Sequence, residues 1–117
     1  LTPCNNPMLR TFVVASSFTI SDVNIGVRLS HTYRGDLRLF LISPGGTSVT
    51  LMQNIATAPD NLNVLFDSSA AASITTHTAL DDSATSGPPY QRTFSPQTSL
   101  AVFNGTNSAG TWTLSIC

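Results

Sequence analysis

The sequence contains neither lysine nor glutamate. Its five basic residues are all arginine, its six acidic residues are all aspartate, and charged residues make up only 9% of the 117. Lysine and glutamate are typical of exposed helix faces, so their absence argues against surface helices. With a formal net charge of −1 the chain has no basic field to hold a nucleic-acid backbone, and we expect no nucleic-acid partner.

Long apolar runs are missing as well. No segment approaches the ~18 apolar residues of a membrane-spanning helix, so we expect no membrane contact. Pro3, Asn5 and Asn6 interrupt the first residues, which therefore do not form a signal peptide. Any export signal would lie on a longer precursor. The length suits a single domain, residues 1–117, built around one core.

What the sequence does contain is short apolar alternation interrupted by turn residues. The alternation predicts seven strands, at residues 8–14, 18–29, 37–43, 48–52, 62–67, 92–94 and 111–116. The fold class is therefore all-β, and the mixture of long and short connections favours a β-sandwich of jelly-roll or Greek-key type.

Several single residues add detail to this fold. Gly26 predicts either a bulge or a close backbone approach. Trp112 shares an apolar strand face and is predicted to pack in the core rather than to stack on a sugar. Asp36 is expected to be buried at the start of its strand, while Asp81 and Asp82 are expected in a solvated loop.

The two cysteines, Cys4 and Cys117, lie at opposite ends of the chain. In an exported domain they are expected to form a disulfide that joins the termini, worth roughly 4–5 kcal/mol for so long a loop. The alternative is two unrelated free thiols. Two cysteines cannot build a zinc site, and neither His31 nor His77 has ligand spacing to them.

Residues 31–50, which begin H-T-Y-R-G-D-L and continue to S-P-G-G-T, resemble the P domain (Homo B domain) of proprotein convertases and of many secreted bacterial subtilisin-like proteases and metalloproteases. Other family landmarks follow in the right order. They are D-N at 60–61, F-D at 66–67, the segment 87–105 with its L-x-x-F-N-G signature, and G-T-W-T-L at 110–114. The family continues for roughly twenty residues to a closing strand, so we expect either that this sequence is cut short or that the closing strand is absent.

This resemblance implies a non-catalytic accessory domain of a secreted, bacterial protease, either a serine endopeptidase or a metallopeptidase. Such a domain would support the folding and stability of a catalytic domain in the same chain, touch protein substrate, and act as a monomer outside the cell. An independent binding module for carbohydrate or fibrous protein is the alternative, with Tyr33 and Tyr90 as its candidate surface. A small hydrolase is disfavoured because no G-x-S-x-G elbow is present.

Calcium is the cofactor that the acidic residues favour, because it takes oxygen ligands from loops. Bacterial P domains hold calcium, so the resemblance implies a site where acidic landmarks flank strand ends. The expected ligands are Asp36, Asp60, Asn61 and Asp67. Asp81 and Asp82 are a weaker second candidate. The alternative is that Asp36 caps its own loop by accepting backbone hydrogen bonds, with no ion.

Overall fold

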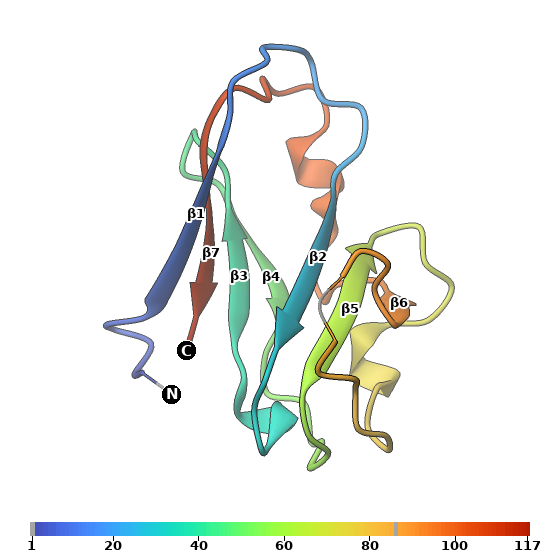
Figure 1. Cartoon of the computed structure of the whole chain (residues 1–117). Helices are drawn as coiled ribbons and strands as arrows, with labels where there is room; N and C mark the ends of the chain where they lie inside the picture. Colours follow the sequence, from blue (N-terminus) through green and yellow to red (C-terminus); the bar gives the residue numbers. More distant parts are fainter. Residues whose placement is uncertain (1, 86) are drawn as a thin grey trace.

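The computed structural model describes residues 2–85 and 87–117 (Figure 1). In these residues seven strands form two sheets that face each other, which confirms the predicted all-β sandwich. The large sheet has the order β1 (Met8–Val14), β7 (Gly110–Ile116), β3 (Leu39–Ile42) and β4 (Ser48–Met52). The small sheet has the order β2 (Asn24–Leu29), β5 (Leu62–Asp67) and β6 (Arg92–Phe94).

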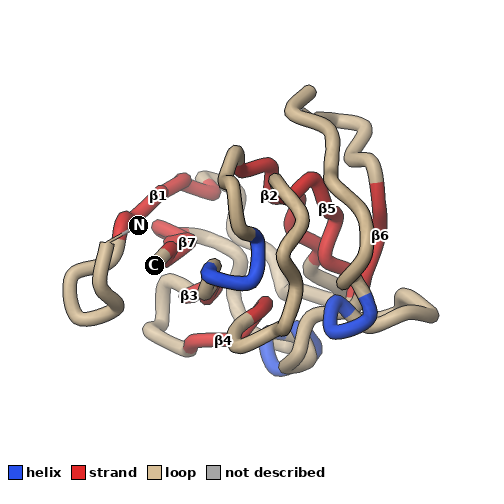
Figure 2. The backbone as a smooth tube through the Cα atoms, turned by 90° about the horizontal axis from the view of Figure 1, so that it is seen from below, coloured by secondary structure: helices blue, strands red, loops and turns tan. Residues whose placement is uncertain are grey.

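The core lies between the sheets, where alternate residues of each strand point inward. Leu39 and Leu41 of β3 face Val64 and Phe66 of β5, and each of the four is at most 1% exposed. Trp112 is 5% exposed, which confirms the prediction that it packs in the core. Its ring lies edge-on to the ring of Phe103, with the two centroids 5.1 Å apart. The view along the strands shows the two layers (Figure 2).

The predicted strand at 18–29 is shorter than expected, because β2 begins only at Asn24. The residues before Asn24 pair with the loop between η3 (Leu100–Phe103) and β7 and not with a strand. The Ile20 N–H donates to the Thr106 carbonyl at 2.9 Å. Residues 18–23 therefore close one end of the sandwich.

The predicted strand at 37–43 is also shorter, since β3 starts at Leu39 and follows the short 3-10 helix η1 (Arg34–Asp36). Two further 3-10 turns occur, η2 (Ile74–Thr76) and η3 (Leu100–Phe103). No helix of the described residues is long and apolar enough to cross a membrane.

A disulfide between Cys4 and Cys117 joins the two ends of the chain, as predicted, with the Cα atoms 5.1 Å apart. The segment that precedes β1 and the end of β7 lie next to each other (Figure 1). Met8 of β1 is paired with Ile116 of β7, the residue before Cys117. The disulfide therefore joins the two strands just beyond the end of their pairing.

Candidate functional site

The residues predicted to bind calcium fall at both ends of β5. Asp60 and Asn61 directly precede this strand and Asp67 is its last residue, so about 20 Å of extended chain separates them. Asp36 lies in η1, which a backbone hydrogen bond of 3.0 Å joins to Pro59. Asp36, Asp60 and Asn61 therefore share one end of the sandwich, and Asp67 cannot join them around one ion.

Two of these side chains accept hydrogen bonds, and a third is exposed. Asp67 accepts hydrogen bonds from the Ser69 hydroxyl (2.7 Å) and N–H (2.9 Å), which lower the pKa of its carboxyl. Asn61 accepts from the His31 N–H at 3.0 Å. Asp36 is exposed, not buried as expected, and its carboxylate caps no N–H among the described residues. Residues 2–85 and 87–117 contain no group of three or more Asp, Glu, His or Cys side chains that could hold a metal ion.

The loop expected to be solvated holds a buried charge, so the prediction for Asp82 was wrong. Its side chain is fully buried, with both oxygens 2.9 Å from Nε2 of His77. The Nε of Arg92 donates to it at 2.7 Å and the Asn63 N–H at 2.9 Å. Burial by itself raises the pKa of Asp82, but the bonds from His77, Arg92 and Asn63 outweigh it and hold the pKa below its usual range. Asp81 is exposed, as expected.

Arg34 is the second fully buried charge, with a guanidinium nitrogen 3.9 Å from the Asp82 carboxylate. Burial lowers the pKa of Arg34, and the negative charge of Asp82 opposes this shift. The guanidinium donates to one hydroxyl, of Thr57, and to the main-chain carbonyls of Asp60, Asn61, His77 and Leu80, at 2.8–3.3 Å. Arg34 therefore ties η1 to two loops that are distant in sequence. We call Arg34, His77, Asp82 and Arg92 the carboxylate network.

Gly35 belongs to the same packing. A Cβ at this position would lie 2.6 Å from the carbonyl oxygens of Ile55 and Thr57, closer than real contacts allow. The Gly35 N–H donates to the Thr57 carbonyl at 2.8 Å. The R-G-D residues of the resemblance motif therefore combine one buried cation, one position without room for a side chain, and one exposed acid.

The histidines do not form a nucleophilic site with the residues described. Nε2 of His77 contacts Asp82, and its ring stacks on Phe94 with centroids 4.9 Å apart. Nδ1 of His31 contacts the backbone of Tyr33. Nucleophilic catalysis needs a hydroxyl or thiol within hydrogen-bond reach of the base, and none contacts either ring in the described structure.

The two tyrosines proposed as a binding surface have different environments. Tyr33 is 48% exposed. Tyr90 is half-buried, and its ring occupies the space beside Gly26, where an added Cβ would come within 1.9 Å of it. The β2–β5 register passes through Gly26 without a shift, so this glycine marks a close approach and not a bulge. Tyr90 therefore has a packing role, whereas Tyr33 leaves about half of its surface in solvent.

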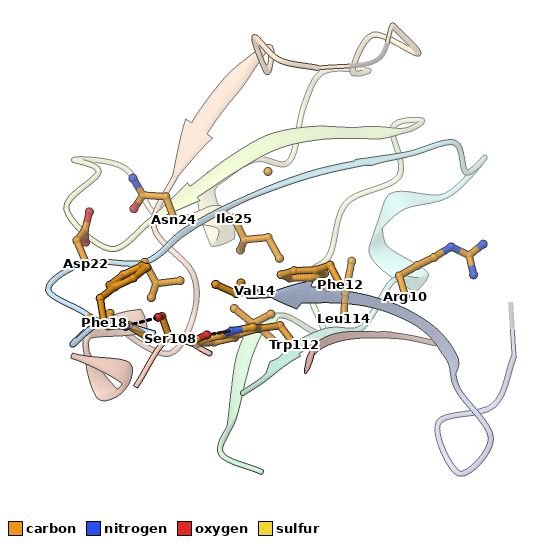
Figure 3. A pocket seen from close by; sticks show the side chains of 14 residues that line it. Arg10, Phe12, Val14, Phe18, Asp22, Asn24, Ile25, Ser108, Trp112 and Leu114 are labelled. Carbon is orange, nitrogen blue, oxygen red and sulfur yellow. Dashed lines mark hydrogen bonds between the residues drawn. The ribbon is translucent and has the colours of Figure 1, made fainter. Parts of the chain in front are cut away.

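Sequence reasoning missed an apolar groove of about 570 Å³ between β1 and β2 (Figure 3). Phe12 and Val14 of β1 and Ile25 of β2 form its walls, and Trp112 and Leu114 of β7 form its floor. One signal was available in the sequence, because β1 carries apolar residues on both of its faces. A strand of this kind is normally covered on both sides.

Comparison with known proteins identifies the family. Residues 20–117 match the proprotein convertase P-domain family. The chain belongs to this family. No curated protein and no solved structure gives a significant match. The resemblance noted in the sequence is thus confirmed over β2 to the C-terminal cysteine, while β1 precedes the matched range.

P domains are non-catalytic accessory domains that sit with a catalytic protease domain and occur in secreted proteases. The family motif at residues 31–50 spans η1, β3 and the first residues of β4 in this structure. Its arginine supplies the buried guanidinium that joins the loops at one end of the sandwich. The arginine of this motif therefore has a structural role.

Proposed function

We propose that this chain is the accessory P domain of a secreted bacterial protease, where it stabilises the catalytic domain and contacts the protein substrate. The family match over residues 20–117 carries the proposal. The disulfide of Cys4 with Cys117 supports it, because such bonds persist in oxidising compartments outside the cytosol. Calcium bound at the end of the sandwich that holds Asp36, Asp60 and Asn61 is part of the proposal.

The stabilisation would follow from linkage. A partner that binds only the native state of a catalytic domain stabilises it by about 2.7 kcal/mol when its concentration is 100 times the Kd. A domain tethered by a short linker has an effective concentration in the millimolar range. An interface with a Kd of about 10 µM would therefore suffice. The disulfide and the carboxylate network suit this role, since they hold the surface in one shape before binding.

The test compares the catalytic domain of the same reading frame with and without residues 1–117. The measurement is the half-life of proteolytic activity at a raised temperature, together with the yield of refolding from denaturant. We expect a longer half-life and a higher yield with the domain present, and partial restoration when the separate chain is added. Reduced, unfolded chain is the control. A reading frame with no protease, or equal half-lives, would refute the proposal.

A binding module for carbohydrate or fibrous protein is the second candidate, favoured by Phe12 and Phe18, which are 43% and 55% exposed on one groove. Co-sedimentation with cellulose, chitin and collagen fibrils tests it. Retention that Phe12→Ser abolishes, while Val102→Ser on η3 does not, would favour the module. Trp112 offers no sugar platform, because it is buried.

A further inference from the structure

Asn104 and Gly105 form the single Asn-Gly pair of the sequence, and both residues are exposed directly after η3. In such a pair the backbone nitrogen of the glycine can attack the side-chain amide of the asparagine, because glycine has no side chain to obstruct the approach. The pair is therefore a candidate site for a covalent modification that needs no enzyme. Whether it reacts depends on the backbone around it.

The fold itself requires glycine at position 105. Asn104 caps the end of η3 with φ −63° and ψ 135°, and Gly105 follows with φ +85°. Residues that carry a side chain rarely adopt this left-handed conformation, which is common where a helix ends. A Cβ on Gly105 would meet nothing within 4 Å, so the backbone conformation and not crowding favours glycine here. The reactive pair thus follows from the way in which η3 ends.

The nitrogen of Gly105 is occupied in the folded chain. Its N–H donates to the Ile20 carbonyl at 2.8 Å, and the Ile20 N–H donates to the Thr106 carbonyl at 2.9 Å. These two bonds join the loop after η3 to the connection between β1 and β2 at one end of the sandwich (Figure 1). The attack requires the Gly105 nitrogen to lose its proton, and the hydrogen bond to Ile20 favours the protonated form. The closed loop therefore opposes the reaction.

The backbone of Asn104 is also turned away from the reactive geometry. The attack closes a five-membered ring, for which Cβ of Asn104 and the nitrogen of Gly105 must be nearly eclipsed about the Cα–C bond. At ψ 135° they are far from eclipsed. Rotating ψ into the ring geometry would turn the Gly105 N–H away from Ile20 and break their hydrogen bond. Both obstacles are therefore removed together when the loop opens.

We propose that Asn104–Gly105 is a modification site that reacts when this loop opens, and that the main product prevents the loop from closing again. The Gly105 nitrogen gives its proton to the solvent and bonds to Cγ of Asn104. The Cγ–Nδ2 bond breaks, and the amide nitrogen takes up a proton and leaves as ammonia. Water then opens the cyclic imide at either of its carbonyls, which yields aspartate or isoaspartate. Water is the only co-reactant, and nothing is oxidised or reduced.

Isoaspartate would change the path of the backbone. The main chain would run through Cβ and Cγ of residue 104, which inserts one methylene group between η3 and Gly105. The Gly105 N–H and the Thr106 carbonyl would then no longer both meet Ile20 in the present register. Ile20 and Phe103 are 5% and 1% exposed, so an open loop would also uncover part of the core. Each unfolding event would thus leave a lasting mark on the chain, whatever its function.

The first experiment compares the folded 117-residue chain with the same chain held in guanidinium chloride, in one mildly alkaline buffer. Isoaspartate is counted by enzymatic methylation and located by mass spectrometry of peptides. The unfolded chain should form isoaspartate at residue 104 about 10- to 100-fold faster, because each of the two hydrogen bonds changes the opening equilibrium by up to about tenfold. Equal rates, or isoaspartate mainly at another asparagine, would overturn the inference.

Two matched variants test whether opening of this loop sets the rate. The Thr106 hydroxyl donates to the Phe103 carbonyl at 2.6 Å, and the Thr76 hydroxyl donates to the Ser73 carbonyl of η2 at the same distance and spacing. Thr106→Val should speed the modification of the folded chain by about two- to tenfold, the value of one hydrogen bond. Thr76→Val is the control and should leave the rate unchanged. Equal effects of the two variants would contradict control by the loop.

Refolding tests the consequence of the modification. After increasing times in guanidinium chloride the native sequence should lose chains that refold, in proportion to its isoaspartate at residue 104. Asn104→Gln should refold in full after the same times, because glutamine would have to close a larger, slower-forming ring. If that variant does not fold, Asn104→Asp takes its place, since it has no amide to lose. Modified chains that refold with an unchanged unfolding midpoint would overturn the second half of the proposal.

Discussion

Replacing Asp82 by asparagine would leave Arg34 as an unpaired cation in the protein interior. The substitution keeps the size of the side chain but removes a negative charge 2.7 Å from Nε of Arg92 and 3.9 Å from a nitrogen of Arg34. Removing one partner of a buried ion pair costs about 3–5 kcal/mol. Arg34 would keep its bonds to carbonyl groups, and Arg92, at 26% exposure, could turn to solvent. We therefore expect the lower value, about 3 kcal/mol.

Thermal unfolding followed by circular dichroism at neutral pH measures this loss. In a domain of this size about 4 °C corresponds to 1 kcal/mol, so the midpoint should fall by about 12 °C. Asp81→Asn is the matched control, since its exposed carboxylate accepts one hydrogen bond, from the Asp60 N–H at 2.7 Å. The control should lose less than about 1 kcal/mol. An equal or smaller loss for Asp82→Asn would refute the reasoning and show that the cost of desolvating these charges cancels their attraction.

The same residue gives a pH dependence. The pKa of Asp82 is lower in the folded chain than in the unfolded chain, where it is about 3.9. The ionised carboxylate therefore contributes stability that is fully present above the unfolded pKa and is lost as the pH falls through the folded pKa. The unfolding midpoint should fall between about pH 5 and about pH 2, and less steeply in Asp82→Asn. Parallel curves for the two proteins would contradict this expectation.

Three further outcomes are expected. Reduction of the Cys4–Cys117 disulfide, which spans 113 residues, should lower the free energy of unfolding by about 4–5 kcal/mol in denaturant titrations, and an unchanged value would exclude the disulfide as a stabilising link. The unfolding midpoint should be higher in calcium than in excess chelator. This difference should disappear in Asp36→Asn and remain in Asp67→Asn. Equal midpoints of the native chain in calcium and in chelator would remove calcium from the proposal. Gly35→Ala should cost about 1–3 kcal/mol, because its Cβ would crowd two carbonyl groups. Gly45→Ala should cost almost nothing, since its Cβ would meet only the Ser43 hydroxyl at 3.9 Å, and similar losses in the two variants would contradict the packing role of Gly35.

The fold was predictable because it rests on regular patterns. Alternation marks Leu39 and Leu41, and then Val64 and Phe66, as inward residues without any knowledge of what they contact. The boundaries at 18–29 and 37–43 were wrong where a nearby loop or turn supplied the hydrogen bonds that a strand would have used. Local pattern predicts that a strand exists more reliably than where it ends.

Charged residues were harder to place, because their burial depends on partners far along the chain. Asp82 is covered by His77 from its own connection, but also by Asn63 of β5, Arg92 of β6 and Arg34 of η1. Nothing local separates it from Asp81, which is exposed. The predicted calcium ligands were hard to place for the same reason. They flank strand ends and were expected to converge, but Asp67 lies at the opposite end of β5 from Asp60 and Asn61.

By itself the sequence determined the all-β class, the inward faces of the strands and the family, and it favoured the pairing of the two cysteines. Each of these depends on residue type and on spacing along the chain. Only the tertiary structure decided that Arg34 and Asp82 are buried together and that Arg10 and Asp22 lie at opposite ends of one apolar groove. Those placements depend on how the two sheets and their loops meet, and contact between distant segments leaves no period in the sequence.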